Sequence, residues 1–205
     1  MIIYQQIGCA DFPCSDVKHD RYIIPTIDID PLYIKAALIS EAAPPEGKDY
    51  YYAAGAPLFE QTTVLAFQDA GADAESIEDL LQIGIYLTTA VKCGKTGYGI
   101  KAGTINECAL ILEKELGQFP NLKVLLLMGD VAIKALNAIS RRAGQGRVIP
   151  AGSTYKIRHQ KYYFGDIRTF PSYLQAGPSF FIEKSKRRMV AEDLKYALEI
   201  IRTNH

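Results

Sequence analysis

Apolar residues fall in short continuous runs along much of the chain, and stretches with helical spacing lie between them. The clearest run is Val124–Met128, which lacks the alternation of a half-exposed strand and is typical of a strand covered on both faces. Residues 34–40 and Ile83–Val91 predict two further strands, the second from its β-branched and aromatic residues. Tyr162–Ile167 predicts a fourth.

Between these runs, apolar residues recur at intervals of three and four, as they do on one face of a helix. A short helix is expected to start at Ser76 with Asp79, and Thr104 with Glu107 forms a capping box that opens another. Gly129 and Asp130 end the third strand and cap the helix after it. The spacing predicts helices over 59–70, from 104 onward, over 131–140 and over 184–202, whereas 1–33 is expected to be irregular and 50–59 (YYYAAGAPLF) a surface loop.

The alternation of short buried strands with helices is typical of a three-layer α/β/α sandwich. We therefore expect a single domain over residues 1–205, with a four-stranded, mostly parallel sheet between two helical layers. A chain of this length buries a full core without help from disulfides or a second copy, so a monomer is expected. No run approaches the roughly 20 apolar residues of a membrane span, and Met1–Ile3 lacks the charged start of a signal peptide. We expect a cytoplasmic protein with no membrane partner.

The formal net charge is zero, but the charges are unevenly distributed. Residues 1–80 hold 14 acidic and 4 basic residues, whereas residues 81–205 hold 9 acidic and 19 basic ones. This asymmetry favours a polyanionic partner for the second half of the chain. A solvated basic surface without any such partner is the alternative.

The segment 35–49 (KAALISEAAPPEGKD) is a short apolar strand that ends at Ser40 and Glu41 and continues into a loop made rigid by Pro44 and Pro45. Open α/β sheets bind ligands beyond the carboxyl ends of their parallel strands. Glu41 and Glu46 are therefore candidate catalytic carboxylates. The alternative is a strand-to-turn junction in which Glu41 caps its own loop.

The four cysteines are Cys9, Cys14, Cys93 and Cys108, with four residues between the first two and fourteen between the last two. Cytosolic proteins seldom keep disulfides, so an even count favours metal or redox chemistry. Four thiolates suit an iron–sulfur cluster or a tetrahedral zinc ion, and the long spacings favour the cluster. Cysteines are also among the most buried residues, so plain packing is the alternative, above all for Cys108 on an apolar helix face.

Several segments together resemble the uracil-DNA glycosylase superfamily, and most closely its iron–sulfur branch, family four. ISEAAPPE is similar to the Gly-Glu-Ala-Pro-Gly-Glu motif, GAPLFEQ to Gly-Arg-Pro-Phe-Val-Gly, and IYLTTAVKC to Tyr-Ile-Thr-Asn-Val-Val-Lys-Cys. TFPSYL is similar to Thr-Tyr-His-Pro-Ser-Tyr-Leu, and KRRMVAEDLKYAL to the terminal helix. The motifs occur in the same order from about residue 8 to residue 199.

This resemblance implies a DNA repair enzyme that flips a damaged base and hydrolyses its N-glycosidic bond. It also implies a 4Fe–4S cluster on the four cysteines, although the family has two residues, not four, between the first pair. Glu41 matches the catalytic acid, with Glu46 or Asp49 as a second carboxylate. The base-binding positions implied are Thr89, Leu58, Phe59 and Phe170, and the DNA-binding ones are Pro171, Ser172, Tyr173, Leu174 and Arg187.

Two positions depart from the family pattern. Thr89 stands where the family has its base-reading Asn, and Phe170 where it has His. A lost donor commonly lowers the rate by about 10²–10³, so the departures favour altered base specificity over ordinary uracil excision. His159 is the histidine placed to replace the missing one. The alternative is a catalytically inactive relative that binds DNA or a nucleobase; a hydrolase of small nucleotides is disfavoured because no Ser/His/Asp set is evident.

Overall fold

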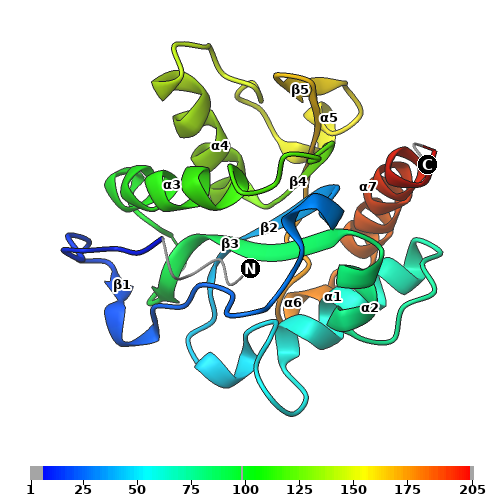
Figure 1. Cartoon of the computed structure of the whole chain (residues 1–205), viewed down its shortest axis with the longest axis horizontal. Helices are drawn as coiled ribbons and strands as arrows, with labels where there is room; N and C mark the ends of the chain where they lie inside the picture. Colours follow the sequence, from blue (N-terminus) through cyan, green and yellow to red (C-terminus); the bar gives the residue numbers. More distant parts are fainter. Residues whose placement is uncertain (1–6, 98, 204–205) are drawn as a thin grey trace.

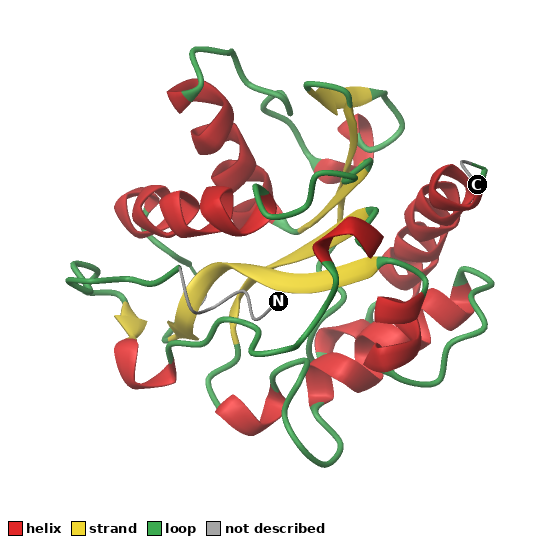
Figure 2. Ribbon diagram, viewed as in Figure 1, coloured by secondary structure: helices red, strands yellow, loops and turns green. Residues whose placement is uncertain are grey.

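A mixed β-sheet runs through the middle of the protein, with helices on both of its faces (Figures 1 and 2). The computed structural model describes residues 7–97 and 99–203, so the first six residues of the expected irregular segment lie outside the described residues. Within these ranges six strands form one sheet in the order β1-β3-β2-β4-β6-β5. The strands are β1 (Val17–Lys18), β2 (Ala36–Ala43), β3 (Ile85–Lys95), β4 (Val124–Met128), β5 (Tyr162–Phe164) and β6 (Ile167–Ser172).

The four central strands β3, β2, β4 and β6 are parallel, and each edge strand is antiparallel to its neighbour. The fold is therefore α/β, as the sequence predicts, but the prediction of a four-stranded sheet is wrong. The expected strand at 162–167 is the first arm and the turn of a hairpin, β5 and β6, and only β6 joins the parallel set. The apolar pattern could not separate the two arms because they are joined by only two residues, Gly165 and Asp166.

The helices form a layer on each face of the sheet, α3 and α4 on one and α1, α2 and α7 on the other (Figure 1). Within the described residues the α-helices are α1 (Leu58–Asp69), α2 (Ile77–Gln82), α3 (Ala102–Leu116), α4 (Asp130–Arg142), α5 (Thr154–Ile157), α6 (Ser179–Ile182) and α7 (Lys184–Arg202). Short 3₁₀ turns follow β1 (His19–Arg21), precede β2 (Pro31–Tyr33) and follow it (Gly47–Asp49). None of the helices in the described ranges is both long and apolar enough to cross a membrane.

Strand β4 shows why the apolar runs lack alternation. Leu125 and Leu127 pack in the core beneath α3 and α4, whereas Leu126 and Met128 pack in the core beneath α1 and α7. All five residues of β4 are fully buried. A strand between two helical layers has no solvent face, so every position is apolar.

Local signals located some helix starts and missed others. Ser76 and Asp79 form the expected capping box at the start of α2. Helix α3 instead begins at Ala102, and the Thr104 hydroxyl bonds to Asp16 rather than capping the helix. The segment 50–59 is a turn followed by the start of α1, but Tyr50 and Tyr51 are almost completely buried, so the prediction of a surface loop is wrong for them.

The pairing of β2 with β3 is irregular near the carboxyl ends of the strands. Ala42 lies opposite Val91, but Ala43 lies opposite Gly94, so Lys92 and Cys93 are extra residues on β3. A bulge of this kind re-aims the side chains around it. The Lys92 side chain turns toward α3, and Cys93 joins the core beneath the same helix.

Lys92 forms a completely buried ion pair with Glu115 of α3. Its ammonium also donates to the Thr88 hydroxyl at 2.8 Å and to the Thr89 carbonyl at 2.7 Å. The other Glu115 oxygen accepts from the Tyr86 hydroxyl at 2.5 Å and from Thr88 at 2.7 Å. Burial, followed by the nearby Glu115 charge, raises the pKa of Tyr86 well above its ordinary value, so this hydroxyl remains a donor.

Replacing Lys92 by Met should destabilise the protein by about 3–5 kcal/mol, because Glu115 is then a buried charge without its cation. Adding Glu115→Leu should recover at least half of that loss, since the double variant contains no buried charge here. The free energy of unfolding from urea titration is the measurement. Equal losses in the single and double variants would contradict this account of the pair.

Candidate functional site

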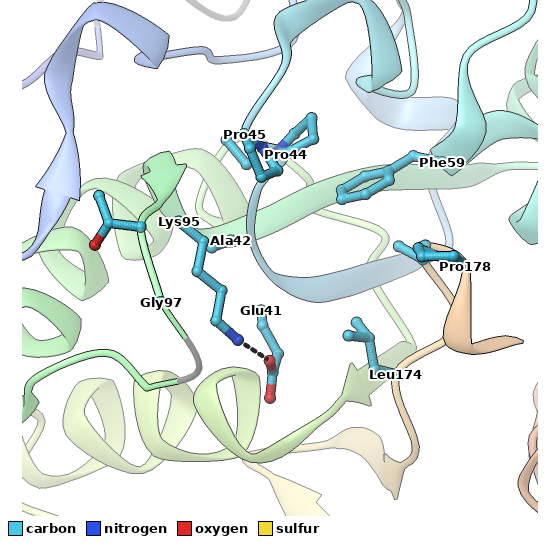
Figure 3. A pocket seen from close by; sticks show the side chains of 13 residues that line it. Glu41, Ala42, Pro44, Pro45, Phe59, Lys95, Gly97, Leu174 and Pro178 are labelled. Atoms are coloured by element: carbon cyan, nitrogen blue, oxygen red, sulfur yellow. Dashed lines mark hydrogen bonds and ion pairs between the residues drawn. The ribbon is translucent and has the colours of Figure 1, made fainter. Parts of the chain in front are cut away.

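A cavity of about 400 Å³ opens where the central strands end (Figure 3). Four segments form its walls: Glu41–Pro45 at the end of β2, Lys95–Gly97 at the end of β3, Phe59 of α1, and residues between Leu174 and Pro178 after β6. Most of the lining is apolar. Ligand sites of α/β proteins typically lie at the carboxyl ends of parallel strands. They are mostly apolar and contain a small number of polar or charged groups, as this cavity does.

Glu41 holds its carboxylate between β3 and the start of α4. One oxygen lies 3.4 Å from the Lys95 ammonium, and the other accepts a long hydrogen bond, 3.5 Å, from the Val131 backbone N–H. Both charged side chains are partly exposed to the cavity, Lys95 by 27% and Glu41 by 17%. The carboxylate thus faces the positive end of a helix, which favours negative charge. The expectation that Glu41 caps its own loop receives no support from these contacts.

Gly129 leaves the space that the Glu41 carboxylate occupies. Its φ is +103°, and a Cβ at this position would lie 2.7 Å from the Glu41 carboxylate oxygen Oε1. Only glycine combines that backbone conformation with so close an approach. The absence of a side chain at Gly129, which joins β4 to α4, therefore allows the start of α4 to contact Glu41.

A buried polar network supports the opposite wall of the cavity. The Gln175 amide nitrogen donates to the hydroxyls of Tyr51 and Thr63, each at 3.0 Å, and the Tyr51 hydroxyl bonds to Ser40 of β2. Burial raises the pKa of Tyr51 to about 12, although its three polar partners lower it, so its hydroxyl is neutral. This network ties the segment after β6 to β2 and thereby fixes Leu174 and its neighbours at the cavity rim.

The structure brings together only part of the expected base-binding set. Phe59 lines the cavity, but Leu58 beside it does not, and Glu46 is an exposed residue outside it. Thr89 is fully buried and shares the face of β3 that carries Leu87, beneath α1, whereas Glu41 points toward α4 on the other face. Thr89 and Glu41 therefore do not converge.

Phe170 also lies away from Glu41. It is buried in β6, with the Arg168 guanidinium 4.1 Å from the centre of its ring, and it borders a separate hollow between β6 and α7. His159 borders the same separate hollow, so it does not bring an imidazole to Glu41. Neither residue lines the cavity, and among residues 7–97 and 99–203 the polar side chains of its lining are Glu41, Lys95 and Thr96.

Two of the implied DNA-binding positions lie in the sheet. Pro171 and Ser172 are buried residues of β6, so they do not form a loop with Tyr173 and Leu174 as the resemblance implies. Tyr173 and Leu174 are the first residues after the strand, and Leu174 lines the cavity. Arg187 of α7 donates to Asp69 of α1 at 2.8 Å, and this bond raises the pKa of the guanidinium. Arg187 therefore joins two helices.

The four cysteines lie around one second cavity, of about 180 Å³. Cys9 and Cys14 come from the coil before β1, Cys93 from β3 and Cys108 from α3, and all four are free thiols. Burial, and then the other three cysteines, raises the pKa of Cys93 to about 12. Three remote parts of the sequence thus place their thiols at one position.

The loop between Cys9 and Cys14 is wound tightly around Phe12, whose φ of +44° is unusual for a bulky residue. Its ring packs edge-on against Tyr22, with the ring centres 5.1 Å apart, and the Tyr22 hydroxyl accepts from the Cys9 backbone N–H at 3.1 Å. This left-handed turn brings Cys9 and Cys14 to the same cavity despite the four residues between them.

Among residues 7–97 and 99–203, no group of three or more His, Cys, Asp and Glu side chains is arranged to hold a metal ion. Four thiolates bound to one zinc at about 2.3 Å must crowd within about 4 Å of one another. A four-iron cluster presents a separate iron to each thiolate and so holds them further apart. Four thiols around a shared cavity are the donor type that either group takes.

Lys95 and Gly129 belong to the site but were not singled out from the sequence. The apolar run predicted that the strand ends near residue 91, which assigned Lys95 to a glycine-rich loop. In the structure β3 continues to Lys95 because β1 pairs with its end. Gly129 was recognised as a strand end, but nothing in the local sequence relates it to Glu41.

Protein-family models give no match to this chain, and no curated protein matches it. The resemblance to uracil-DNA glycosylases therefore stays a prediction from the motifs.

Gly129→Ala tests the contact between α4 and Glu41, with Gly144→Ala as its control. Both glycines have positive φ, but a Cβ at Gly144 would meet nothing within 4 Å. Gly144→Ala should therefore lower the free energy of unfolding only by the cost of placing alanine at a positive φ, about 1–2 kcal/mol. Gly129→Ala should lose more, by about 1 kcal/mol or above, because φ +103° with ψ 170° is a conformation almost restricted to glycine and because Glu41 must also move. Equal losses in urea unfolding would show that the close approach is unimportant.

Proposed function

We propose that the protein is a DNA base-excision glycosylase of the uracil-DNA glycosylase superfamily with altered base specificity. It flips a deaminated or otherwise damaged base out of DNA and hydrolyses the N-glycosidic bond in the cavity beside Glu41. The observation that carries this proposal is a carboxylate and an aromatic ring, Glu41 and Phe59, on the walls of one mostly apolar cavity at the strand ends. A single chain supplies all of these groups, so we propose that it acts as a monomer.

Four side chains of the cavity have a role in this reaction. The transition state carries positive charge on the sugar and negative charge on the departing base. The Glu41 carboxylate stabilises the first and orients the attacking water, while Lys95 and Thr96 donate to the base in place of the family's Asn and His. Phe59 offers the base a stacking surface.

We further propose that Cys9, Cys14, Cys93 and Cys108 hold a 4Fe–4S cluster. Their shared cavity and the separate elements that supply them support this assignment. The cluster would connect the N-terminal coil to β3 and α3, which is a structural role rather than a catalytic one.

The segment after the cavity is proposed to face DNA. Pro178 lines the cavity and precedes α6, where Ile182 is 77% exposed and Phe181 is 47% exposed. Exposed Lys184 and Arg188 follow at the start of α7. An apolar side chain that wedges between base steps, next to cations that neutralise phosphates, suits duplex DNA. Ile182 is the proposed wedge.

A non-catalytic relative is the second candidate function. The observation in its favour is that Thr89 and Phe170, which replace the base-reading Asn and His, both lie away from Glu41. Such a protein would bind DNA or a nucleobase without cleaving the glycosidic bond.

Incubation with duplex oligonucleotides that carry uracil, hypoxanthine, xanthine or alkylated bases, followed by alkali, separates the two candidates. We expect strand breaks at one or more lesions. Glu41→Gln should lower the rate by about 100-fold or more, whereas Glu46→Gln, the same change at an exposed acid, should leave it unchanged. Duplex binding in a gel shift without release of any base would favour the non-catalytic relative.

Purification without oxygen should give a brown protein with absorbance near about 400 nm and about four irons and four sulfides per chain. Cys93→Ala should lose this colour and most of the iron, because one thiolate is missing. Metal analysis and the absorbance spectrum are the measurements. A colourless protein with one zinc per chain would contradict the cluster.

A further inference from the structure

The amine of Lys95 differs from that of Lys92, three residues earlier, in how it is held. Lys92 is completely buried and bonds to three groups, whereas Lys95 is 27% exposed and projects into the cavity. Among the described residues, the hydrogen-bond and ion-pair partner of the Lys95 ammonium is Glu41, 3.4 Å away. Figure 3 shows the two side chains pointing toward each other from neighbouring strands.

We propose that Lys95 is a nucleophile that forms a Schiff base with the abasic sugar left after base excision, and that the protein thereby cuts the DNA strand. This inference rests on the proposed glycosylase function and adds a second activity to the same cavity. Lysine amines form Schiff bases with carbonyl substrates, and apolar surroundings activate such an amine. The Glu41 carboxylate beside Lys95 is the group that accepts its proton.

The abasic sugar is in equilibrium with a ring-opened form that carries an aldehyde at C1′. Lys95 must first lose a proton to Glu41, so that its nitrogen carries a free electron pair. The nitrogen then bonds to C1′, and the aldehyde oxygen takes up the proton that nitrogen releases. Glu41 returns its proton to the resulting hydroxyl, water leaves, and an iminium ion remains.

The same carboxylate can complete strand cleavage. Glu41, ionised again, removes a proton from C2′. The electrons of that C–H bond form a C2′–C3′ double bond, and the C3′–O3′ bond breaks with its electron pair going to the 3′ phosphate. Water then hydrolyses the imine and frees Lys95. No oxidant, reductant or metal enters any step.

The cavity provides what these steps require. Its mostly apolar walls, among them Phe59 and Leu174, enclose a hollow of about 400 Å³, which is large enough for the sugar. The amine and the carboxylate act on adjacent sugar carbons, C1′ and C2′, and their separation of 3.4 Å places both within reach of one sugar.

Borohydride trapping on an oligonucleotide that already contains an abasic site tests this step apart from base excision. Borohydride reduces the iminium to a stable amine, so a covalent protein–DNA band should appear on a denaturing gel. Mass spectrometry of the digested adduct should locate the sugar on Lys95. Lys95→Arg keeps the cation beside Glu41 but cannot form the imine, so the band should fall at least tenfold.

Lys48→Gln is the matched control, because Lys48 is an exposed lysine that does not line the cavity, and its band should equal that of the unchanged protein. Thermal melting of each variant checks that it folds. No trapping on the abasic oligonucleotide, or an adduct on another amine, would overturn the inference. Base release from lesions is measured separately, so either activity can fail without the other.

Discussion

The buried pair of Lys92 and Glu115 is the constraint on which both sites depend. It fastens the middle of β3 to α3, in a place where neither charge reaches water. Cys93 follows Lys92 directly, and Cys108 lies on the helix that carries Glu115, so the pair fixes the distance between two of the four thiols. The strand then continues to Lys95 in the cavity. One ion pair thus positions the sulfur site and the carboxylate site with respect to each other.

Much of the architecture follows from local pattern. Val124–Met128 and the helix over 184–202 have the predicted bounds. A strand buried on both faces is a continuous apolar run, and a helix buried on one side has apolar residues at intervals of three and four. What the sequence could not predict depends on partners far away in the chain. Strand β3 extends to Lys95 because β1 pairs with its end. The Thr104 hydroxyl donates to Asp16, a residue of a distant segment, instead of capping the helix. The turn between β5 and β6 is so short that the sequence pattern predicts one strand where the structure has a hairpin.

The candidate site shows the same division. Glu41, Phe59 and the four cysteines were identified by residue type and order, and the structure brings each set to one cavity. Thr89 and Phe170 were identified by motif position, but strand geometry turns them into the core beneath α1 and α7. Similarity of residue type and order alone does not show which face of a strand a residue occupies.

The two extra residues of β3 opposite β2 interrupt the regular alternation of side chains between the two faces of the sheet. With strict alternation, the side chains of Lys92 and Cys93 would point to opposite helical layers. Either the ion pair with Glu115 or the thiol beneath α3 would then be lost. The irregular step lets sequence neighbours serve the same layer, one as a cation locked to a helix and the other as a sulfur beside it. The bulge therefore lets two consecutive residues, Lys92 and Cys93, contact the same helical layer in different roles.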